Sequence, residues 1–219
     1  MTGNKINEME KYYAKRASEY EEIYLKSERQ EYIKESKDLL RKYFSNKNVL
    51  EIACGTGFWT EIISETAAKI TATDLNNEVL DIAKNKKYRC KVDFIQDDSY
   101  ILDKIPEKYD SLFAGFWFSH IPKSKIGNFL KVIHNKLDED ALVHFMDNLY
   151  VEGSSTPISR YDSEGNSYQI RKLKDNSRHE VLKNFYDEKS LMECFGNYGG
   201  NIEVQLLKYY WIVKFNFTI

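Results

Sequence analysis

The stretch from Asn48 to Thr60, NVLEIACGTGFWT, constrains the fold of this 219-residue chain more than any other. It begins with a short apolar run that has the length and β-branching of a buried parallel strand. Gly55 and Gly57 interrupt the run, and a helical pattern follows. Such glycines let the backbone approach a ligand closely, and the helix start beyond them carries unpaired N–H groups. This order predicts a nucleotide site in an α/β fold.

The turn lacks the features of two common nucleotide sites. The dinucleotide fingerprint GxGxxG uses its third glycine for close packing of helix on strand, but Thr60 occupies that position here. No Lys–Ser/Thr pair of a phosphate-binding loop follows either. An NAD(P)-dependent reductase is therefore the weaker alternative.

The segment EIACGTG resembles motif I of the class I S-adenosylmethionine (SAM)-dependent methyltransferases, usually written E/D-x-G-x-G-x-G. Glu51, Gly55 and Gly57 match the motif, and Ala53 replaces its first glycine. An acid suits SAM, which carries a sulfonium and an amino group and has no pyrophosphate to repel it. The resemblance implies SAM as cofactor, with Glu51 at its amino group and the three small residues in the cofactor-binding loop.

Composition limits the partners of the chain. Hydrophobic residues make up 42% and charged residues 30%, as in an ordinary globular domain, and the length fits a single domain over residues 1–219. The net charge of -2 argues against nucleic acid, because phosphate contacts need a basic face. No apolar run approaches the roughly 20 residues of a membrane span. We therefore expect a small-molecule acceptor and neither a nucleic-acid nor a membrane partner.

The chain's ends and cysteines indicate its compartment. The polar N-terminus has no apolar signal-peptide core. Three scattered cysteines form no disulfide or zinc framework, and four histidines have no metal-ligand spacing. We expect a cytoplasmic protein without a metal, either a monomer or a homodimer.

Residues 4–25 are predicted to form an amphipathic helix, because apolar and aromatic residues recur at three- and four-residue steps. The ordinary interpretation is a helix packed on the core. The run YYAKRASEYE also resembles the N-terminal helix of many small-molecule methyltransferases, which closes over cofactor and acceptor. The resemblance implies a helical lid over residues 1–45, with Tyr13 at the cofactor and Arg16 and Tyr20 at the acceptor.

Apolar segments alternate with helical patterns through the middle of the chain, which predicts parallel strands joined by helices. After a helix over 28–44, the strands are expected at 49–52, 69–74, 92–96, 109–116 and 141–146. A helix over 187–198, ended by two glycines, precedes two final strands that must pair antiparallel because no helix separates them. The whole order matches a Rossmann-like class I methyltransferase fold, with a mostly parallel seven-stranded sheet, an antiparallel C-terminal strand and an added hairpin.

Acidic residues follow the second and third predicted strands, at the sheet edge where ligands of this fold bind. Asp74 lies 23 residues after Glu51, close to the spacing expected for an acid at the ribose hydroxyls, and Leu75 beside it is assigned to the same cofactor site. The alternative role for Asp74 is an N-cap, although Asn76 could serve instead.

The third strand is followed by two acids in a row. In the family, an acid here meets the adenine amine and the next backbone N–H meets a ring nitrogen. Asp98 and Ser99 match that pattern best. Asp97 is the alternative, and it could also be a turn residue.

Aromatic residues gather near the glycine turn and the fourth strand. Rings near a sulfonium stabilise it by cation–π attraction, which makes Trp59 and Phe116 candidates for the cofactor site and Trp117 a candidate for the acceptor site. Core packing is the competing interpretation for each of them.

His120 follows the fourth strand, where this fold presents its acceptor. It is the histidine placed to act as a general base near neutral pH. The alternative is a histidine whose hydrogen bonds hold the loop, and Ser119 could orient it.

The segments FWFSHIP, RKLKDN and KNFYDEKSL resemble a bacterial subgroup that acts on small acids and includes a phosphonate O-methyltransferase. This resemblance implies that residues 150–186, a loop and hairpin, lie near the acceptor. It implies that Arg160, Arg171 and Lys183 bind its anionic group, since arginine binds carboxylate or phosphonate bidentately; solvated surface charge is the alternative. The predicted function is O-methylation of a small anionic molecule. Nitrogen acceptors stay open, and a non-catalytic SAM-binding module is the second hypothesis.

Overall fold

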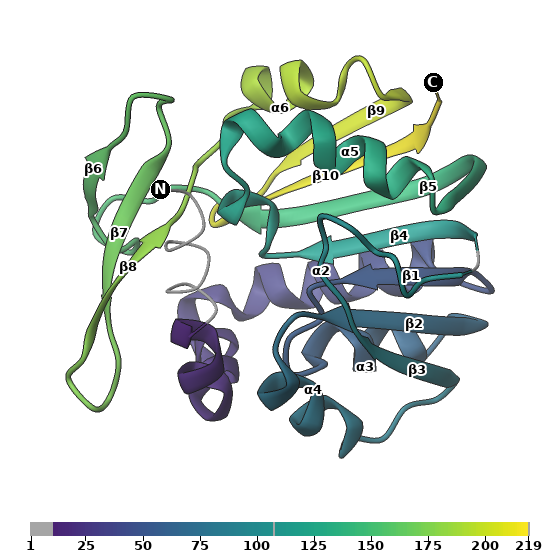
Figure 1. Cartoon of the computed structure of the whole chain (residues 1–219), viewed down its shortest axis with the longest axis horizontal. Coiled ribbons are helices and arrows are strands. Elements are labelled where there is room, and N and C mark those ends of the chain that lie inside the picture. The colour runs from purple at the N-terminus through teal and green to yellow at the C-terminus, as the bar shows by residue number, and fades with distance from the viewer. Residues whose placement is uncertain (1–10, 107, 219) are drawn as a thin grey trace.

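The computed structural model describes residues 11–106 and 108–218, and a seven-stranded sheet forms its centre (Figure 1). The strand order is β3-β2-β1-β4-β5-β10-β9. The strands are β1 (Asn48–Ile52), β2 (Lys69–Asp74), β3 (Lys91–Gln96), β4 (Tyr109–Gly115), β5 (Leu137–Asn148), β9 (Gly199–Leu206) and β10 (Tyr210–Phe217). β1 to β5 pair in parallel, and β10 lies antiparallel between β5 and β9. The predicted fold is confirmed.

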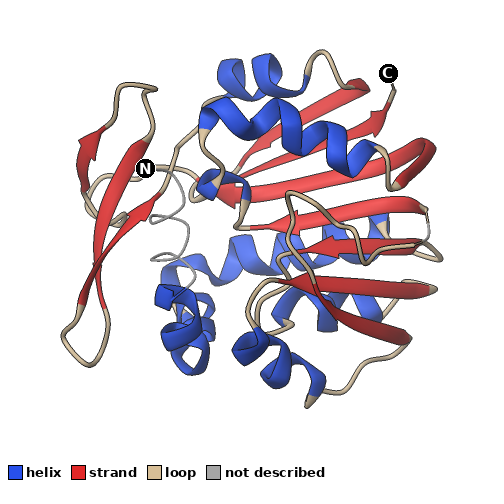
Figure 2. Cartoon of the chain, viewed as in Figure 1, coloured by secondary structure: helices blue, strands red, loops and turns tan. Residues whose placement is uncertain are grey.

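Helices cover both faces of this sheet (Figure 2). Buried residues of α2 (Gln30–Tyr43), α3 (Phe58–Ser64) and α4 (Asn77–Lys84) join one apolar cluster. Those of α5 (Ile126–His134) and α6 (Glu188–Phe195) join the cluster on the other face. The sheet is therefore buried on both sides, which explains why its central strands are apolar runs.

The strand β10 illustrates the effect of this two-sided burial on the sequence of a strand. Nearly every residue of the segment YWIVKFNF is buried. A short connection and no helix joins it to β9, so the two strands must run in opposite directions.

The predicted N-terminal helix is wrong in its second half, and residues 4–10 lie outside the described part of the chain. Residues 11–16 are helical, but η1 (Ala17–Leu25) and the short η2 (Ser27–Arg29) are 3₁₀ helices. The side chain of Gln30 donates to the carbonyls of Tyr24 and Lys26 at 2.8 and 3.0 Å. These carbonyls are thus satisfied without continuing an α-helix.

The predicted loop before the hairpin contains a further strand. β6 (Ile158–Tyr161), β7 (Ser167–Lys172) and β8 (Arg178–Leu182) form a three-stranded antiparallel sheet. A tight turn joins β6 to β7, because the Asp162 carboxylate accepts the backbone N–H groups of Glu164 and Asn166. A four-residue polar edge strand carries too little apolar periodicity to be recognised from sequence.

Two element ends also differ from the sequence prediction. α6 ends at Phe195, and Gly199 and Gly200 begin β9 instead of terminating the helix. β5 begins at Leu137, before the predicted strand 141–146, and the backbone of Leu137 pairs with that of Tyr109.

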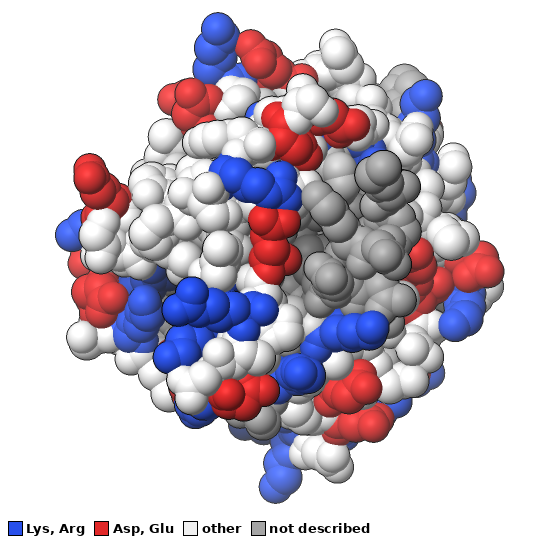
Figure 3. Space-filling view, turned by 60° about the vertical axis from the view of Figure 1, so that its left-hand side comes forward, with Lys and Arg blue, Asp and Glu red and all other residues white. Residues whose placement is uncertain are grey.

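The small sheet stands at the end of the main sheet toward which the arrowheads of β4 and β5 point (Figure 1). Acidic and basic side chains are interspersed on the face that Figure 3 turns toward the viewer. Within residues 11–106 and 108–218, no helix is long and apolar enough to cross a membrane.

His144 on β5 is fully buried, and neither ring nitrogen has a hydrogen-bond partner among the described residues. The rings of Tyr43, Phe44 and Phe113 lie with centroids 5.8, 6.0 and 5.7 Å away. Burial, with a smaller contribution from the charge of Lys214, lowers the pKa of His144 to about 3. The imidazole is therefore neutral in the folded protein.

This histidine should make the fold sensitive to acid. An unfolded chain protonates histidine near pH ~6.5, whereas the folded protein resists protonation down to a pKa of about 3. The free energy of unfolding should therefore fall as the pH drops below ~6.5, by about 2 kcal/mol from this residue between pH 8 and pH 5. His144→Phe should flatten that dependence in urea titrations. Equal pH slopes in variant and parent would contradict this assignment.

Candidate active site

A cleft of about 520 Å³ lies at the carboxyl edge of the main sheet, between that sheet, the N-terminal segment and the small sheet. We call it the main cleft. Residues from the ends of β2, β3 and β4 and from β7 and β8 line it. The predicted site residues that line it are Tyr13, Tyr20, Ala53, Gly55, Asp74, Leu75, Asp98, Ser99, Phe116, Trp117 and His120. The tertiary structure thus gathers most of the predicted site into one cavity.

Asp74 ties the glycine turn to the end of β2. Its two oxygens accept the backbone N–H groups of Gly55 and Asn76, each at 2.9 Å. Burial raises the pKa of Asp74 to about 6, and these hydrogen bonds oppose the rise. Each carboxylate oxygen can accept a second hydrogen bond, so ligand hydroxyls can still bind here.

The structure gives the two acids after β3 different surroundings. Asp97 is buried, and its oxygens accept the backbone N–H groups of Asp98 and Lys104 at 2.9 and 3.1 Å. Asp98 lines the main cleft, and one of its oxygens accepts the N–H of Tyr100. Asp97 therefore shapes the turn, and Asp98 faces the cavity.

The glycine turn opens its backbone toward the cleft. Gly55 has a φ of +58°, and no atom lies within 4 Å of the place a Cβ would occupy. Ala53 adopts a similar φ of +53°, which is strained for a residue with a side chain. Gly57 does not line the main cleft: it precedes α3, and a Cβ there would meet the Tyr88 hydroxyl at 2.6 Å.

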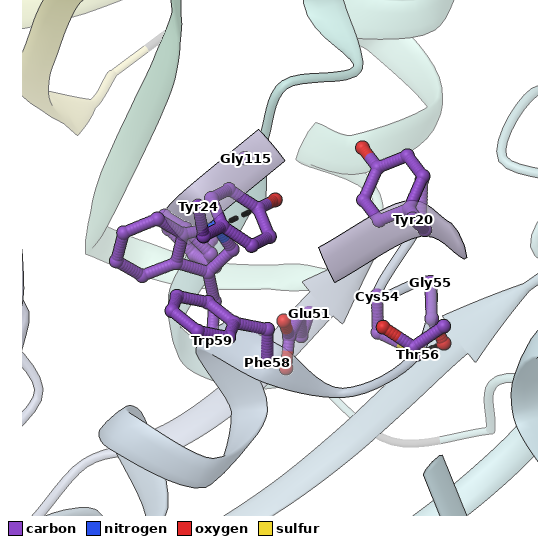
Figure 4. Close-up of a pocket in the computed structure, with 11 residues that line it drawn as sticks. Tyr20, Tyr24, Glu51, Cys54, Gly55, Thr56, Phe58, Trp59 and Gly115 are labelled. Carbon is purple, nitrogen blue, oxygen red and sulfur yellow. Dashed lines mark hydrogen bonds between the residues drawn. The ribbon is translucent and has the colours of Figure 1, made fainter. Parts of the chain in front are cut away.

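A small pocket of about 20 Å³ adjoins the main cleft behind the glycine turn, and we call it the inner pocket. Figure 4 shows Glu51 between the rings of Phe58 and Trp59 and the turn at Cys54. Burial raises the pKa of Glu51 to about 8, and its Oε2 has no hydrogen-bond partner among the described residues. A buried carboxyl beside aromatic rings is suited to a cationic group.

Trp59, predicted at the cofactor site, lies in this inner pocket with Glu51 and not in the lining of the main cleft. Its Nε1 donates to the Tyr24 hydroxyl at 3.1 Å, and its ring stacks on Phe116 with centroids 5.9 Å apart. It supports Phe116, which lines the main cleft from the left-handed region at a φ of +59°. Tyr24 was missed from the sequence because it seemed an ordinary core residue.

His120 is buried at the wall of the main cleft, with both ring nitrogens engaged. Its Nδ1 donates to the Leu182 carbonyl at 2.6 Å, since a carbonyl can only accept. Its Nε2 therefore accepts the hydrogen bond of the Tyr13 hydroxyl at 2.8 Å. Burial, followed by the charge of Lys183, holds the pKa of His120 well below its usual value. The residue is a neutral base at physiological pH.

Lys183 does not line the main cleft, which corrects its predicted position. Its buried ammonium donates to Asp147 Oδ1 and Ser119 Oγ, each at 2.6 Å. Asp147 also accepts the backbone N–H of Ser119. Burial lowers the pKa of Lys183 to about 8, against the opposing charge of Asp147. Asp147 ends a strand at the same edge as the predicted acids, a signal by which sequence reasoning could have found it.

Arg171 and Arg16 lie around the tyrosines of the N-terminal segment, outside the lining of the main cleft. The charges of both arginines lower the pKa of Tyr13, although burial raises it overall. Arg171 also contributes to the low pKa of His120. The guanidinium of Arg16 lies 5.2 Å from the ring centroid of Tyr20. Positive charge therefore surrounds the Tyr13–His120 contact.

Arg160 is separated from the other two predicted cations. It pairs with Glu180 and lies 3.7 Å over the ring of Tyr168. Directly paired residues share a face of a sheet, and Arg160 pairs with Tyr168 while Arg171 pairs with His179. The odd spacing puts Arg160 and Arg171 on opposite faces, so the predicted cluster of three does not form.

Comparisons with known proteins agree with this geometry. Residues 49–140 match a family model described as a methyltransferase domain. Ubiquinone biosynthesis O-methyltransferases of Coxiella burnetii are 27% identical over 78 residues, or 35% of this chain. The match spans about a third (33%) of the length of those relatives.

Solved structures match nearly the whole chain. A DhpI–SAH complex has a TM-score of 0.79 at 23% identity, covering 96% of this chain and 95% of that one. A DhpI–SAM–HEP complex gives 0.76 at 23% identity and covers 96% of each chain. The PH0226 protein from Pyrococcus horikoshii OT3 gives 0.69 at 15% identity, with 88% and 92% covered. The chain therefore has the fold of these structures, and its residues 49–140 match a methyltransferase domain, in agreement with the predicted family.

Among the described residues, no group of three His, Cys, Asp or Glu side chains is arranged to hold a metal. The roles given above to individual site residues remain predictions. The predicted site residues fall into two parts of the site, an acidic and aromatic part near the glycine turn and a part around His120.

Breaking the buried Lys183–Asp147 pair by removing one partner should destabilise the fold. Removing one partner leaves an uncompensated buried charge, at a cost of about 3–5 kcal/mol. Lys183→Met should lower the free energy of unfolding in urea by that amount, and Lys183→Met with Asp147→Asn should recover most of it. Lys34→Met, which breaks the exposed Lys34–Asp38 pair, is the control and should have little effect. A double variant as unstable as the single one would contradict the assignment.

Proposed function

We propose that the chain transfers a methyl group from SAM to a hydroxyl oxygen of a small, anionic acceptor. The observation that carries the proposal is the main cleft, which together with the adjoining inner pocket brings three carboxyl-bearing strand ends near a neutral histidine. Its volume of about 520 Å³ falls within the range of small-molecule sites.

The acids of the cleft fit SAM as cofactor. Glu51, with a partnerless oxygen in a ring-lined pocket, would hold the amino group. Asp74 would accept hydrogen bonds from the ribose hydroxyls, and Asp98 one from the adenine amine, with Leu75 and Ser99 beside them. When bound, SAM supplies an electrophilic methyl group on its sulfonium. The chain's own task is to orient the acceptor and exclude water, worth up to ~7–11 kcal/mol in well-oriented reactions.

His120 is the proposed general base. The Leu182 carbonyl holds the proton on Nδ1, which leaves the Nε2 lone pair directed toward Tyr13 and the cleft. Because burial keeps the imidazole neutral, Nε2 can take a proton from an acceptor hydroxyl at pH 7. Such a base contributes typically ~10²–10⁴-fold to rate.

The proposed anionic character of the acceptor follows from the charges around His120. Arg171 and Arg16 both lie close enough to perturb the titration of Tyr13 at this end of the cleft, whereas the charge of Lys183 is balanced by Asp147. Acids of the small sheet also line the cleft, and each has a partner: Glu164 bonds to Ser124, Glu180 pairs with Arg160, and Asp162 accepts from Asn166 and Tyr168. An anionic group of the acceptor would therefore be directed toward the two arginines beside Tyr13. The similarity to relatives named as O-methyltransferases supports oxygen as the methylated atom.

A non-catalytic SAM-binding module is the second candidate. An open, polar surface beside the methyl position would favour it. The cleft is instead walled by the aromatic side chains of Tyr13, Tyr20, Trp117 and Tyr168, which favours an enzyme.

Calorimetry tests the cofactor assignment. SAM should bind, and NADPH should not, because Thr60 replaces the glycine of the dinucleotide fingerprint. Asp74→Asn should weaken SAM binding about 10-fold or more by removing acceptor capacity at the ribose. Asp110→Asn is the matched control, since Asp110 also accepts a backbone N–H, from Asn48, but at the opposite edge of the sheet. Binding of NADPH without SAM would overturn the assignment.

The same calorimetric titration also tests the role of Glu51 through its change of ionisation. Its raised pKa of about 8 leaves it mostly protonated at pH 7, and a bound ammonium would favour the charged form. SAM binding should therefore release a proton, seen as heats that depend on the ionisation enthalpy of the buffer. Glu51→Gln should abolish the buffer dependence.

The acceptor assignment is tested by screening metabolites for release of S-adenosylhomocysteine. With an acceptor in hand, Arg171→Ala should raise its KM about 10-fold by removing a positive charge close to the Tyr13–His120 contact, and leave SAM affinity intact. Lys174→Ala, which breaks an exposed ion pair with Glu22 on the turn after β7, should leave KM unchanged. Equal effects of the two substitutions would contradict an anion site at Arg171.

A further inference from the structure

The Tyr13 hydroxyl donates a hydrogen bond to the basic nitrogen of His120, Nε2. The two groups are 2.8 Å apart, and their rings meet edge to face with centroids 5.4 Å apart. The Leu182 carbonyl takes the proton on the other ring nitrogen, so Nε2 can only accept. A ring nitrogen has one in-plane lone pair, and here the chain's own phenol uses it.

Tyr13 also lies close to two arginines. Arg171 and Arg16 both act on its hydroxyl electrostatically. Its ring contacts those of Tyr12 and Tyr20 with centroids 4.9 and 6.1 Å away. The phenol thus presents a hydroxyl to the base while positive charges lie nearby. An acceptor that carries a hydroxyl next to an anionic group would need the same two contacts.

We propose that the Tyr13 side chain is a stand-in for the acceptor, and that the acceptor hydroxyl binds by displacing Tyr13 from His120. The proposal rests on the proposed role of His120 as the base. It makes Tyr13 a residue that sets acceptor affinity and selects for acceptors able to compete for Nε2.

The alternative is that Tyr13 relays the proton and stays in place. Burial raises the pKa of Tyr13 above its ordinary value of ~10, so its phenolate is disfavoured. A relay would require that phenolate or a concerted double transfer. Displacement needs only the loss of one hydrogen bond, which is replaced by an equivalent bond from the acceptor.

A chemical probe tests the occupation of His120 without any acceptor. Diethyl pyrocarbonate modifies neutral imidazole at a free nitrogen, and mass spectrometry follows each histidine separately. Tyr13→Phe keeps the ring and removes the hydrogen bond, so modification of His120 should become several-fold faster, with His134 as internal reference. Tyr12→Phe removes a neighbouring hydroxyl that does not touch His120, and it should leave the rate unchanged. An unchanged rate in Tyr13→Phe would overturn the proposal.

Kinetics with an acceptor found by the S-adenosylhomocysteine screen test displacement itself. Removing the competing hydrogen bond should lower the acceptor KM of Tyr13→Phe about 2- to 10-fold, with kcat within about twofold of the parent. A large loss of kcat would mean that Tyr13 takes part in proton transfer and would overturn displacement. If no acceptor is methylated but modification still accelerates, the proposed function fails while the blocked state of His120 stands.

Discussion

The buried ion pair between Lys183 and Asp147 is the interaction on which the geometry of the site depends. It joins the end of β8 to the end of β5, and both partners also bond to Ser119, the residue before His120. The small sheet is thereby fixed against the main sheet, and the Leu182 carbonyl is placed where it orients the imidazole. A buried pair contributes little net stability but strongly penalises arrangements that separate its charges. Its role here is to specify one position of the small sheet.

The opposite half of the site contains buried carboxyl groups that are not paired with a cation. Glu51 and Asp74 lie at strand ends with raised pKa values, and among the described residues neither has a hydrogen bond from a cationic side chain. Burying these carboxyl groups costs free energy in the unliganded protein, because burial disfavours their charged form. A cationic ligand would relieve it, so the stored desolvation favours binding. The two halves are complementary: one has buried acids without a cationic partner, and the other has arginines close to the Tyr13 hydroxyl.

Local patterns predicted the parallel strands well, because each strand of a two-sided sheet is a continuous apolar run bounded by turn residues. They failed for β6, a four-residue edge strand, and for η1, where the Tyr24 carbonyl accepts a hydrogen bond from the Gln30 side chain. Both failures occur beside the cleft. Elements there follow contacts made across the fold more than their own propensities.

The sequence by itself determined the fold and the acidic edge of the site, since strand order fixes which strand ends meet and Glu51, Asp74 and Asp98 each end or follow one. Only the tertiary structure decided the positions of the cations. Arg160 and Arg171 look equivalent in sequence, yet the pairing register of a three-stranded sheet puts them on opposite faces. Lys183 turned to Asp147 and not to the cleft because a buried ammonium requires a partner, and that partner lies 36 residues away in the chain.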